Sequence, residues 1–127
     1  MNDWKRISNI VAIEYYVPEN ILTNDDLEKI FGHWSAEQIY KNTGVKTRHI
    51  ANNGICASDL GIEAVNKLFE KNSIDQKFVE MLIFCSQTHD HYLPATSCII
   101  QEKLGLPNSC GAFDMNFGCS GYVYGLA

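Results

Sequence analysis

One cysteine of this sequence lies where backbone geometry makes a thiol reactive. Cys119 stands in the small-residue run Gly118-Cys119-Ser120-Gly121, which follows a short strand pattern and precedes a helical one. The first N–H groups of a helix have no carbonyl partner, and the helix dipole favours negative charge at that end. Such a position lowers the pKa of a thiol from its usual ~8.5 and supplies the thiolate, which attacks acyl carbonyls. We therefore predict that Cys119 is a nucleophile; the alternative is a small packing residue at a tight turn.

The glycines on either side of this cysteine suit the same chemistry. Gly118 and Gly121 have no side chain, so a substrate can approach the backbone closely there. A backbone N–H in such a turn can donate to the oxyanion that forms when a thiolate attacks a carbonyl. On the residue pattern alone, acyl transfer and simple packing both stay open.

The other four cysteines form no recognisable motif. The total of five is odd and no pair has the Cys-x-x-Cys spacing, so we expect reduced thiols and no disulfide framework. Cys85, Cys98 and Cys110 lie in apolar or element-forming stretches, and we expect them to be buried. Cys56 opens a helical pattern and has no partner motif.

Two further polar clusters carry no catalytic prediction. His89-Asp90-His91 lacks third and fourth ligands at a recognisable spacing, so we predict no metal and interpret these residues as an exposed loop. The acidic residues Asp25, Asp26 and Glu28 are interpreted as complementing the dipole of a helix, not as an acid–base pair. No Gly-x-Gly-x-x-Gly fingerprint is present, and no cofactor is predicted.

Composition limits the classes of function. The chain has 127 residues, of which 46% are hydrophobic and 20% charged, as in an ordinary globular domain. Fifteen acidic and ten basic residues give a net charge of −5, which argues against binding to nucleic acid or an anionic membrane. No apolar run has the length of a membrane span, and the start Met1-Asn2-Asp3-Trp4 does not resemble a signal peptide. We expect a cytoplasmic protein.

The elements that must position Cys119 alternate along the chain. Strand patterns are typical of residues 7–16, 79–85 and 110–114, and the second is apolar enough to be buried on both faces. Capping residues and apolar spacing predict helices over 23–29, 35–44, 57–71, 94–104 and 120–127. The alternation predicts an α/β fold with a parallel sheet and right-handed crossovers. The apolar end Tyr122–Ala127 has no polar close, so we expect a truncated piece of a larger protein.

Four segments of this chain resemble β-ketoacyl-acyl-carrier-protein synthase III, in the same order and with sensible gaps. They are Tyr16–Asn20 with Thr23-Asn24 and Asp26–Glu28, Thr43–Ala51, Leu93–Thr96 and Asp114–Leu126. The resemblance covers nearly all of the chain. It implies a thiolase-like fold of two similar α/β halves, with residues 1–127 forming an incomplete N-terminal domain of βαβαβα type and the second half absent.

The resemblance also implies a reaction. Cys119 would take an acyl group from acyl-CoA or an acyl-carrier protein, and a malonyl-acyl-carrier protein would lose CO₂ and attack the acyl carbon. The histidine and asparagine that assist this step in the family come from the second half, so the fragment alone is expected to be inactive. The family is dimeric, which implies a homodimer. Two alternatives stay open: a hydroxymethylglutaryl-CoA synthase-like or non-condensing acyltransferase, and a non-catalytic scaffold.

Three residues carry substrate roles by the same resemblance. Thr43 and Arg48 match a motif at the substrate entrance, with anchoring of a helix end and a loop as the alternative. Leu93 matches a loop residue that reaches across the dimer toward the partner's acyl pocket, with a core leucine as the alternative.

Two departures from the family pattern affect the acyl donor. Gln38 and Asn42 stand where the family has a tryptophan and an arginine that clamp the adenine of coenzyme A, and Trp34 is a possible substitute. Phe117-Gly118 replaces two small residues before the nucleophile. Both changes favour a carrier-protein donor over acyl-CoA.

Overall fold

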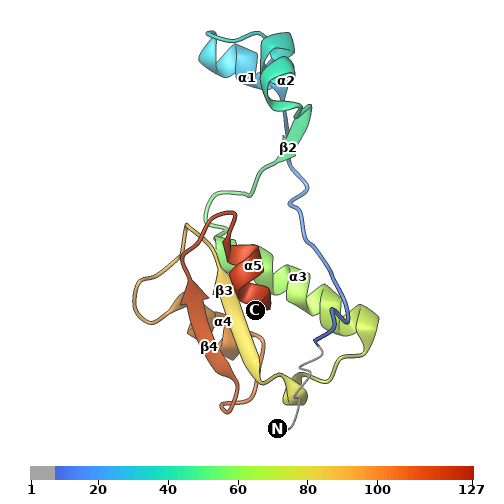
Figure 1. Ribbon diagram of the computed structural model, residues 1–127. Coiled ribbons are helices and arrows are strands. Elements are labelled where there is room, and N and C mark those ends of the chain that lie inside the picture. Colours follow the sequence, from blue (N-terminus) through green and yellow to red (C-terminus); the bar gives the residue numbers. More distant parts are fainter. Residues whose placement is uncertain (1–7) are drawn as a thin grey trace, which may run out of the picture.

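The structure is a computed structural model that describes residues 8–127. Figure 1 shows two parts. A body contains the parallel strands and three helices, and a smaller arm of two short helices and two short strands stands away from it. Two passes of the chain connect them, and the C-terminus lies against the body.

The body is built on a two-stranded parallel sheet. β3 (Met81–Cys85) pairs with β4 (Gly111–Met115) in the register Phe84↔Asp114 and Cys85↔Met115. α4 (Thr96–Lys103) forms the connection between them, as the alternating pattern predicts. The expectation that β3 is buried on both faces is wrong for this chain: Met81 and Cys85 are exposed and the residues between them are half-buried. Among the described residues β3 pairs only with β4, so its other edge is unpaired and these side chains remain accessible to solvent.

Helices cover the two faces of this sheet unequally. α4 and α3 (Ala57–Asn72) lie on one face, where the buried core of Ile100, Leu104, Leu106 and Cys110 packs against β3 and α3. α5 (Gly121–Leu126) lies on the opposite face, against β3 (Figure 1). A short 3₁₀ helix, η1 (Gln76–Phe78), precedes β3. None of the described helices is long and apolar enough to cross a membrane.

The arm consists of locally specified elements. α1 (Asn24–Phe31) and α2 (Ala36–Thr43) begin at the capping boxes of Thr23 and Ser35, and both end at left-handed glycines. β1 (Ile21–Thr23) and β2 (Thr47–His49) pair antiparallel at the base of the arm. The sequence predicts the two helices but not this small sheet, because strands of three residues leave too short a pattern to detect.

The N-terminal segment departs from the sequence prediction. The strand expected over 7–16 is absent from the described residues 8–16, and Ile7 lies outside them. The segment is nevertheless extended, and exposed residues alternate with half-buried ones from Val11 to Val17 as in a strand. It rests on α3 through the Lys71–Glu14 ion pair at 2.8 Å and through Lys67 over the Tyr16 ring. An alternating pattern predicts the conformation; pairing also needs a neighbouring strand.

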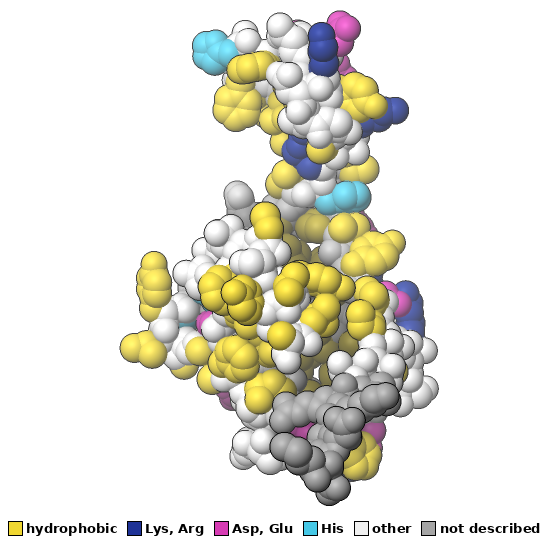
Figure 2. Space-filling view, in the orientation of Figure 1, with side chains coloured by type: hydrophobic (Ala, Val, Ile, Leu, Met, Phe, Trp, Pro, Cys, Tyr) yellow, Lys and Arg dark blue, Asp and Glu magenta, His cyan; other side chains and the backbone are white. Residues whose placement is uncertain are grey.

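Burial differs from expectation at two of the cysteines. Cys110 is buried, but Cys85 and Cys98 are exposed, and all five cysteines are free thiols. Hydrophobic side chains also gather on the face of the body where α5 lies (Figure 2). The four exposed large side chains of α5 are Tyr122, Val123, Tyr124 and Leu126. Apolar sequence predicts burial only where another layer covers the element.

The cap of α1 provides a test of the arm. The Thr23 hydroxyl accepts the Asp26 amide and donates to its carboxylate, so Thr23→Ala should destabilise α1 by about 1 kcal/mol. Amide hydrogen exchange over residues 24–31 measures this as faster exchange. Thr23→Ser keeps the hydroxyl and is the matched control; equal acceleration in both variants would contradict the role of the cap.

Candidate active-site turn

Cys119 lies in the turn that joins β4 to α5. The strand ends at Met115, the helix begins at Gly121, and the cysteine is exposed two residues before the helix. The Gly121 amide donates to the Gly118 carbonyl at 2.9 Å and closes the turn around Cys119. The side chain is therefore neither buried in the core nor inside the helix. It is accessible from solvent.

A second cysteine fixes where α5 begins. The thiol of Cys85, the last residue of β3, donates to the Phe117 carbonyl at 3.7 Å. Its sulfur lies directly against Gly121, so that a Cβ at Gly121 would overlap Cys85 Sγ. Gly121 is buried and must remain a glycine for the helix to approach the strand this closely. This role of Cys85 is not predictable from the sequence, because nothing in a linear pattern places residue 85 beside residue 121.

The remaining contacts of the turn involve its own flanks and the residues that follow β3. The Phe117 ring stacks on Tyr124 of α5, with centroids 5.2 Å apart and planes at 26°. The Ser86 amide donates to the Met115 carbonyl at 3.1 Å and joins the ends of the two strands. At Gly118 an added Cβ would meet only the Gln87 side chain, at 3.4 Å. The Phe117-Gly118 pair therefore fits this turn through aromatic packing on the helix.

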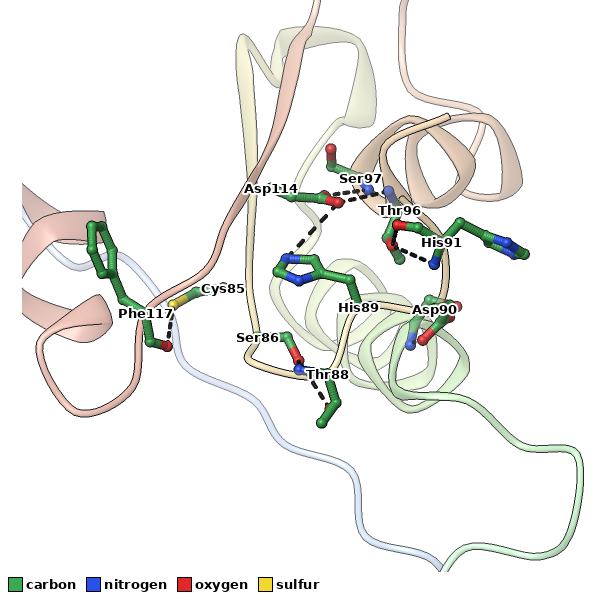
Figure 3. A network of polar contacts seen from close by, with 11 residues as sticks. Cys85, Ser86, Thr88, His89, Asp90, His91, Thr96, Ser97, Asp114 and Phe117 are labelled. Atoms are coloured by element: carbon green, nitrogen blue, oxygen red, sulfur yellow. Dashed lines mark hydrogen bonds and ion pairs between the residues drawn. The ribbon is translucent and has the colours of Figure 1, made fainter. Parts of the chain in front are cut away.

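A carboxylate network lies on the opposite face of the sheet, where Asp114 of β4 meets the start of α4 (Figure 3). Asp114 accepts the amides of Thr96 at 2.8 Å and Ser97 at 2.7 Å. Ala95 precedes α4 and provides no side-chain cap, so Asp114 supplies that cap from another element. Burial raises the pKa of the Asp114 carboxyl, but hydrogen bonds led by the Ser97 amide outweigh it, and the pKa lies below its ordinary 3.8.

His89 belongs to this network, which corrects its interpretation as an exposed loop histidine. Its side chain is only 13% exposed, and Nε2 lies 3.9 Å from Asp114 Oδ2. The ring packs edge-on against Phe84 of β3, with centroids 5.6 Å apart. His91 is exposed as expected. Among residues 8–127, no three His, Cys, Asp or Glu side chains are placed to hold a metal ion.

Leu93 occupies the tip of the loop between β3 and α4. Its side chain is 90% exposed, beside a fully exposed Tyr92, so the alternative of a core leucine does not apply in this chain. The Leu93–Pro94 peptide bond is cis. The loop presents two large apolar side chains outward from the body.

Thr43 and Arg48 lie in the arm and both make structural contacts. The Thr43 hydroxyl donates to the Ile39 carbonyl at 2.7 Å and accepts the Val45 amide at 3.1 Å. Arg48 donates to Asn24 Oδ1 at 2.9 Å, and Asn24 is buried. These contacts are the helix-end and loop anchoring that the sequence leaves open beside a substrate role. Both contacts lie within the arm, which projects away from the body (Figure 1).

The side chains at the altered coenzyme A positions also differ in availability. Gln38 is committed to the capping box of α2, where its Oε1 accepts the Ser35 amide at 3.0 Å. Asn42 is exposed in the last turn of the same helix. Trp34, just before α2, is 56% exposed. An aromatic surface is present in the arm, without a guanidinium at the matching position.

An apolar hollow of about 330 Å³ lies elsewhere on the body. Its lining comes from the N-terminal segment, α3 and α5: Ile10, Ala12, Ile13, Glu14, Ala64, Val65, Leu68, Tyr122 and Leu126. Cys119 is not part of this lining. The hollow is therefore separate from the candidate nucleophile.

Comparison with curated proteins confirms the resemblance drawn from the motifs. The chain is 39% identical over 121 residues to β-ketoacyl-acyl-carrier-protein synthase III of Koribacter versatilis, covering 95% of this chain and 36% of that protein. It is 43% identical to synthase III 2 of Halalkalibacterium halodurans, covering 94% of this chain and 35% of the relative. No family model matches. The chain thus spans about a third of the length of these relatives.

Solved structures give the same result for the fold. A 3-oxoacyl-acyl-carrier-protein synthase III superposes with a TM-score of 0.86 at 44% identity, over 92% of this chain and 35% of the other. The β-ketoacyl-acyl-carrier-protein synthase III of Thermus thermophilus gives 0.85 at 34% identity, over 92% and 36%. The chain is an α/β piece of the thiolase-like fold with parallel strands, as the sequence predicts.

The contact between Gly121 and Cys85 generates a stability prediction. Gly121→Ala should lower the free energy of unfolding by about 1 to 3 kcal/mol, because the new methyl overlaps the sulfur. Gly125→Ala is the matched control, since nothing lies within 4 Å of its added Cβ. Urea unfolding measures both. An equal effect of the two variants would show that Cys85 does not limit the approach of α5. Adding Cys85→Ala to Gly121→Ala should restore part of the lost stability, because it removes the sulfur.

The lowered pKa of Asp114 generates a pH prediction. A carboxylate with a folded pKa below its unfolded 3.8 stabilises the protein above that value and loses this contribution as the pH falls through the folded value. The wild type should exceed Asp114→Asn in unfolding free energy by about 1 to 3 kcal/mol at pH 6, and the gap should shrink below about pH 4. Unfolding series at several pH values test this; a gap that widens in acid would contradict the hydrogen-bonded carboxylate.

Proposed function

We propose that the protein is a condensing acyltransferase of the β-ketoacyl-acyl-carrier-protein synthase III type, in fatty-acid synthesis, and that residues 1–127 are an incomplete N-terminal domain of a thiolase-like molecule. The exposed position of Cys119 in the turn between β4 and α5 carries the proposal. About 40% identity to relatives with this name supports it, over nearly the whole chain. The chain spans about a third of the length of those relatives, so the activity of the complete protein is part of this proposal.

The reaction begins with transfer of an acyl group to Cys119. The thiolate attacks the carbonyl carbon of an acyl thioester, a new C–S bond forms, and the carrier thiolate leaves with the bonding electrons. A backbone N–H of the turn would stabilise the oxyanion in between. The malonyl group of malonyl-acyl-carrier protein then loses CO₂, and its carbanion attacks the acyl carbon. Cys119 departs as thiolate, which restores the enzyme. No cofactor or metal takes part.

The substrate residues are Thr43, Arg48 and Leu93. Leu93 is free to contribute to an acyl pocket, because its side chain has no cover in this chain. Thr43 and Arg48 would act at the entrance while keeping their contacts within the arm. The donor is an acyl-carrier protein in preference to acyl-CoA, since Gln38 and Asn42 cannot form an aromatic–guanidinium clamp.

We further propose a cytoplasmic homodimer without affinity for nucleic acid or membranes. The five free thiols support a reducing compartment. The net charge of −5 argues against a surface that binds polyanions. The exposed Tyr92 and Leu93 offer an apolar contact for a second subunit.

Acylation of Cys119 tests the proposal directly. Intact protein incubated with acetyl- and hexanoyl-acyl-carrier protein should gain one acyl group by mass spectrometry, and Cys119→Ala should gain none. Cys56→Ala is the control, because Cys56 is also exposed and precedes a helix. Equal acylation of wild type and Cys119→Ala would refute the assignment.

Thiol reactivity gives an independent test of the same residue. At neutral pH iodoacetamide should modify Cys119 faster than Cys56 by about tenfold or more, since the proposed thiolate is the reacting form. Peptide mapping after short exposures measures both rates. Equal rates would remove the case for a nucleophile.

The incomplete site predicts inactivity of residues 1–127 alone. The histidine and asparagine that the family uses for decarboxylation are not supplied by these residues. Release of CO₂ from malonyl-acyl-carrier protein should therefore stay at the background rate in the presence of residues 1–127. Measurable turnover by residues 1–127 would overturn this part of the proposal.

A further inference from the structure

The loop between β3 and α4 is tied down at several points, and its tip is free. Ser86 Oγ accepts the Thr88 amide at 3.0 Å. Asp90 accepts the Ser58 amide, from the start of α3, at 3.3 Å. The free part of the loop is the tip, where Tyr92 and Leu93 are almost completely exposed.

Two contacts on either side of this tip lead to one carboxylate. The hydroxyl of the fully buried Thr96 lies 3.4 Å from both the amide and the carbonyl of His91, so it spans the base of the tip. The Thr96 amide donates to Asp114, and His89 faces the same carboxylate from the other side (Figure 3).

The same carboxylate lies on the strand that leads to the nucleophile. Asp114 is the penultimate residue of β4, and Cys119 follows after four residues. In the register of the sheet Asp114 stands beside Phe84, which packs against the His89 ring. One side chain therefore links the Leu93 loop, the start of α4 and the strand before Cys119.

We propose that Asp114 is a positioning residue that holds the Leu93 tip and thereby sets which acyl-chain lengths the enzyme accepts. The inference rests on the proposed function, in which Leu93 reaches the acyl pocket of a second subunit. Asp114 touches neither the acyl group nor Cys119; it acts through Thr96 and His89. A displaced tip changes the room for a long acyl chain more than the room for an acetyl group, because only the long chain reaches a pocket wall.

The substitution Asp114→Asn is the central test. The asparagine side chain keeps one acceptor oxygen and has an NH₂ group in place of the other. The NH₂ group only donates, so either the Thr96 or the Ser97 backbone amide loses its acceptor. The ratio of the acylation rates with hexanoyl- and acetyl-acyl-carrier protein should change by about threefold or more in the intact protein. Alkylation of Cys119 by iodoacetamide should stay within about twofold, because this small reagent needs no acyl pocket.

Two further variants keep the test decisive. Thr96→Val removes the hydroxyl at the base of the tip and keeps a branched side chain of similar size, so it should change the ratio by about threefold or more even if Asp114→Asn fails to fold. Asp75→Asn is the matched control. Its carboxylate also accepts a helix-start amide, from Lys77 at 3.0 Å, but at η1, away from this loop. It should leave the ratio unchanged.

The outcomes separate this inference from the proposed function. If wild-type Cys119 takes no acyl group from either donor, the proposed function fails and the inference fails with it. If wild type is acylated and Asp114→Asn and Thr96→Val keep its ratio, only the inference is overturned. A uniform loss of acylation and alkylation would also overturn it, since it would assign Asp114 a general structural role.

Discussion

The alternation of side chains across a parallel strand pair determines most of what this molecule offers for chemistry. Phe84 and Asp114 stand side by side in the register and serve the face covered by α3 and α4. The next pair in the register is Cys85 and Met115. Cys85 lies on the other face, where its sulfur contacts Gly121 at the start of α5. Because successive residues of a strand point to opposite faces, a single step along the sheet changes from the cap of one helix to the seat of the other. A slip of one residue in the register would exchange these roles and lose both contacts.

Much of the fold could be predicted from the sequence, because many of its elements are specified locally. The capping boxes at Thr23 and Ser35 and the left-handed glycines after α1 and α2 act within a few residues, so the sequence contains all the information needed. The strand predicted over residues 7–16 is absent from the described residues 8–16, because strand pairing is not a local property. Its conformation is local, but hydrogen bonding in a sheet requires another strand, and the described residues supply none beside it. Burial of Cys85 and Cys98 was overestimated in the same way, since composition does not reveal which faces remain uncovered.

The candidate site divides along the same line. The turn around Cys119 is a local feature of small residues and could be predicted with its position between strand and helix. The parts that hold the turn and the neighbouring loop come from elsewhere: Cys85 contacts Gly121, 36 residues further along the chain, and Asp114 caps α4 from 17 or 18 residues away. Only the absence of a capping side chain at Ala95 hinted that an acceptor had to come from outside α4. The burial of His89 cannot be predicted from the sequence, because its neighbours, Phe84 and Asp114, come together only after β3 and β4 pair.

The extended segment over residues 8–17 has a consequence for the order in which contacts form during synthesis of the chain. It rests on α3, including the ion pair of Glu14 with Lys71. During translation about 40 residues more must be made after this segment before α3 begins, which takes roughly 2 to 8 seconds at usual synthesis rates. Through that interval a run with unpaired backbone groups and apolar side chains has no native surface to lie on. The contacts that hold this segment, among them the ion pair with Lys71, therefore form only after α3 has been made.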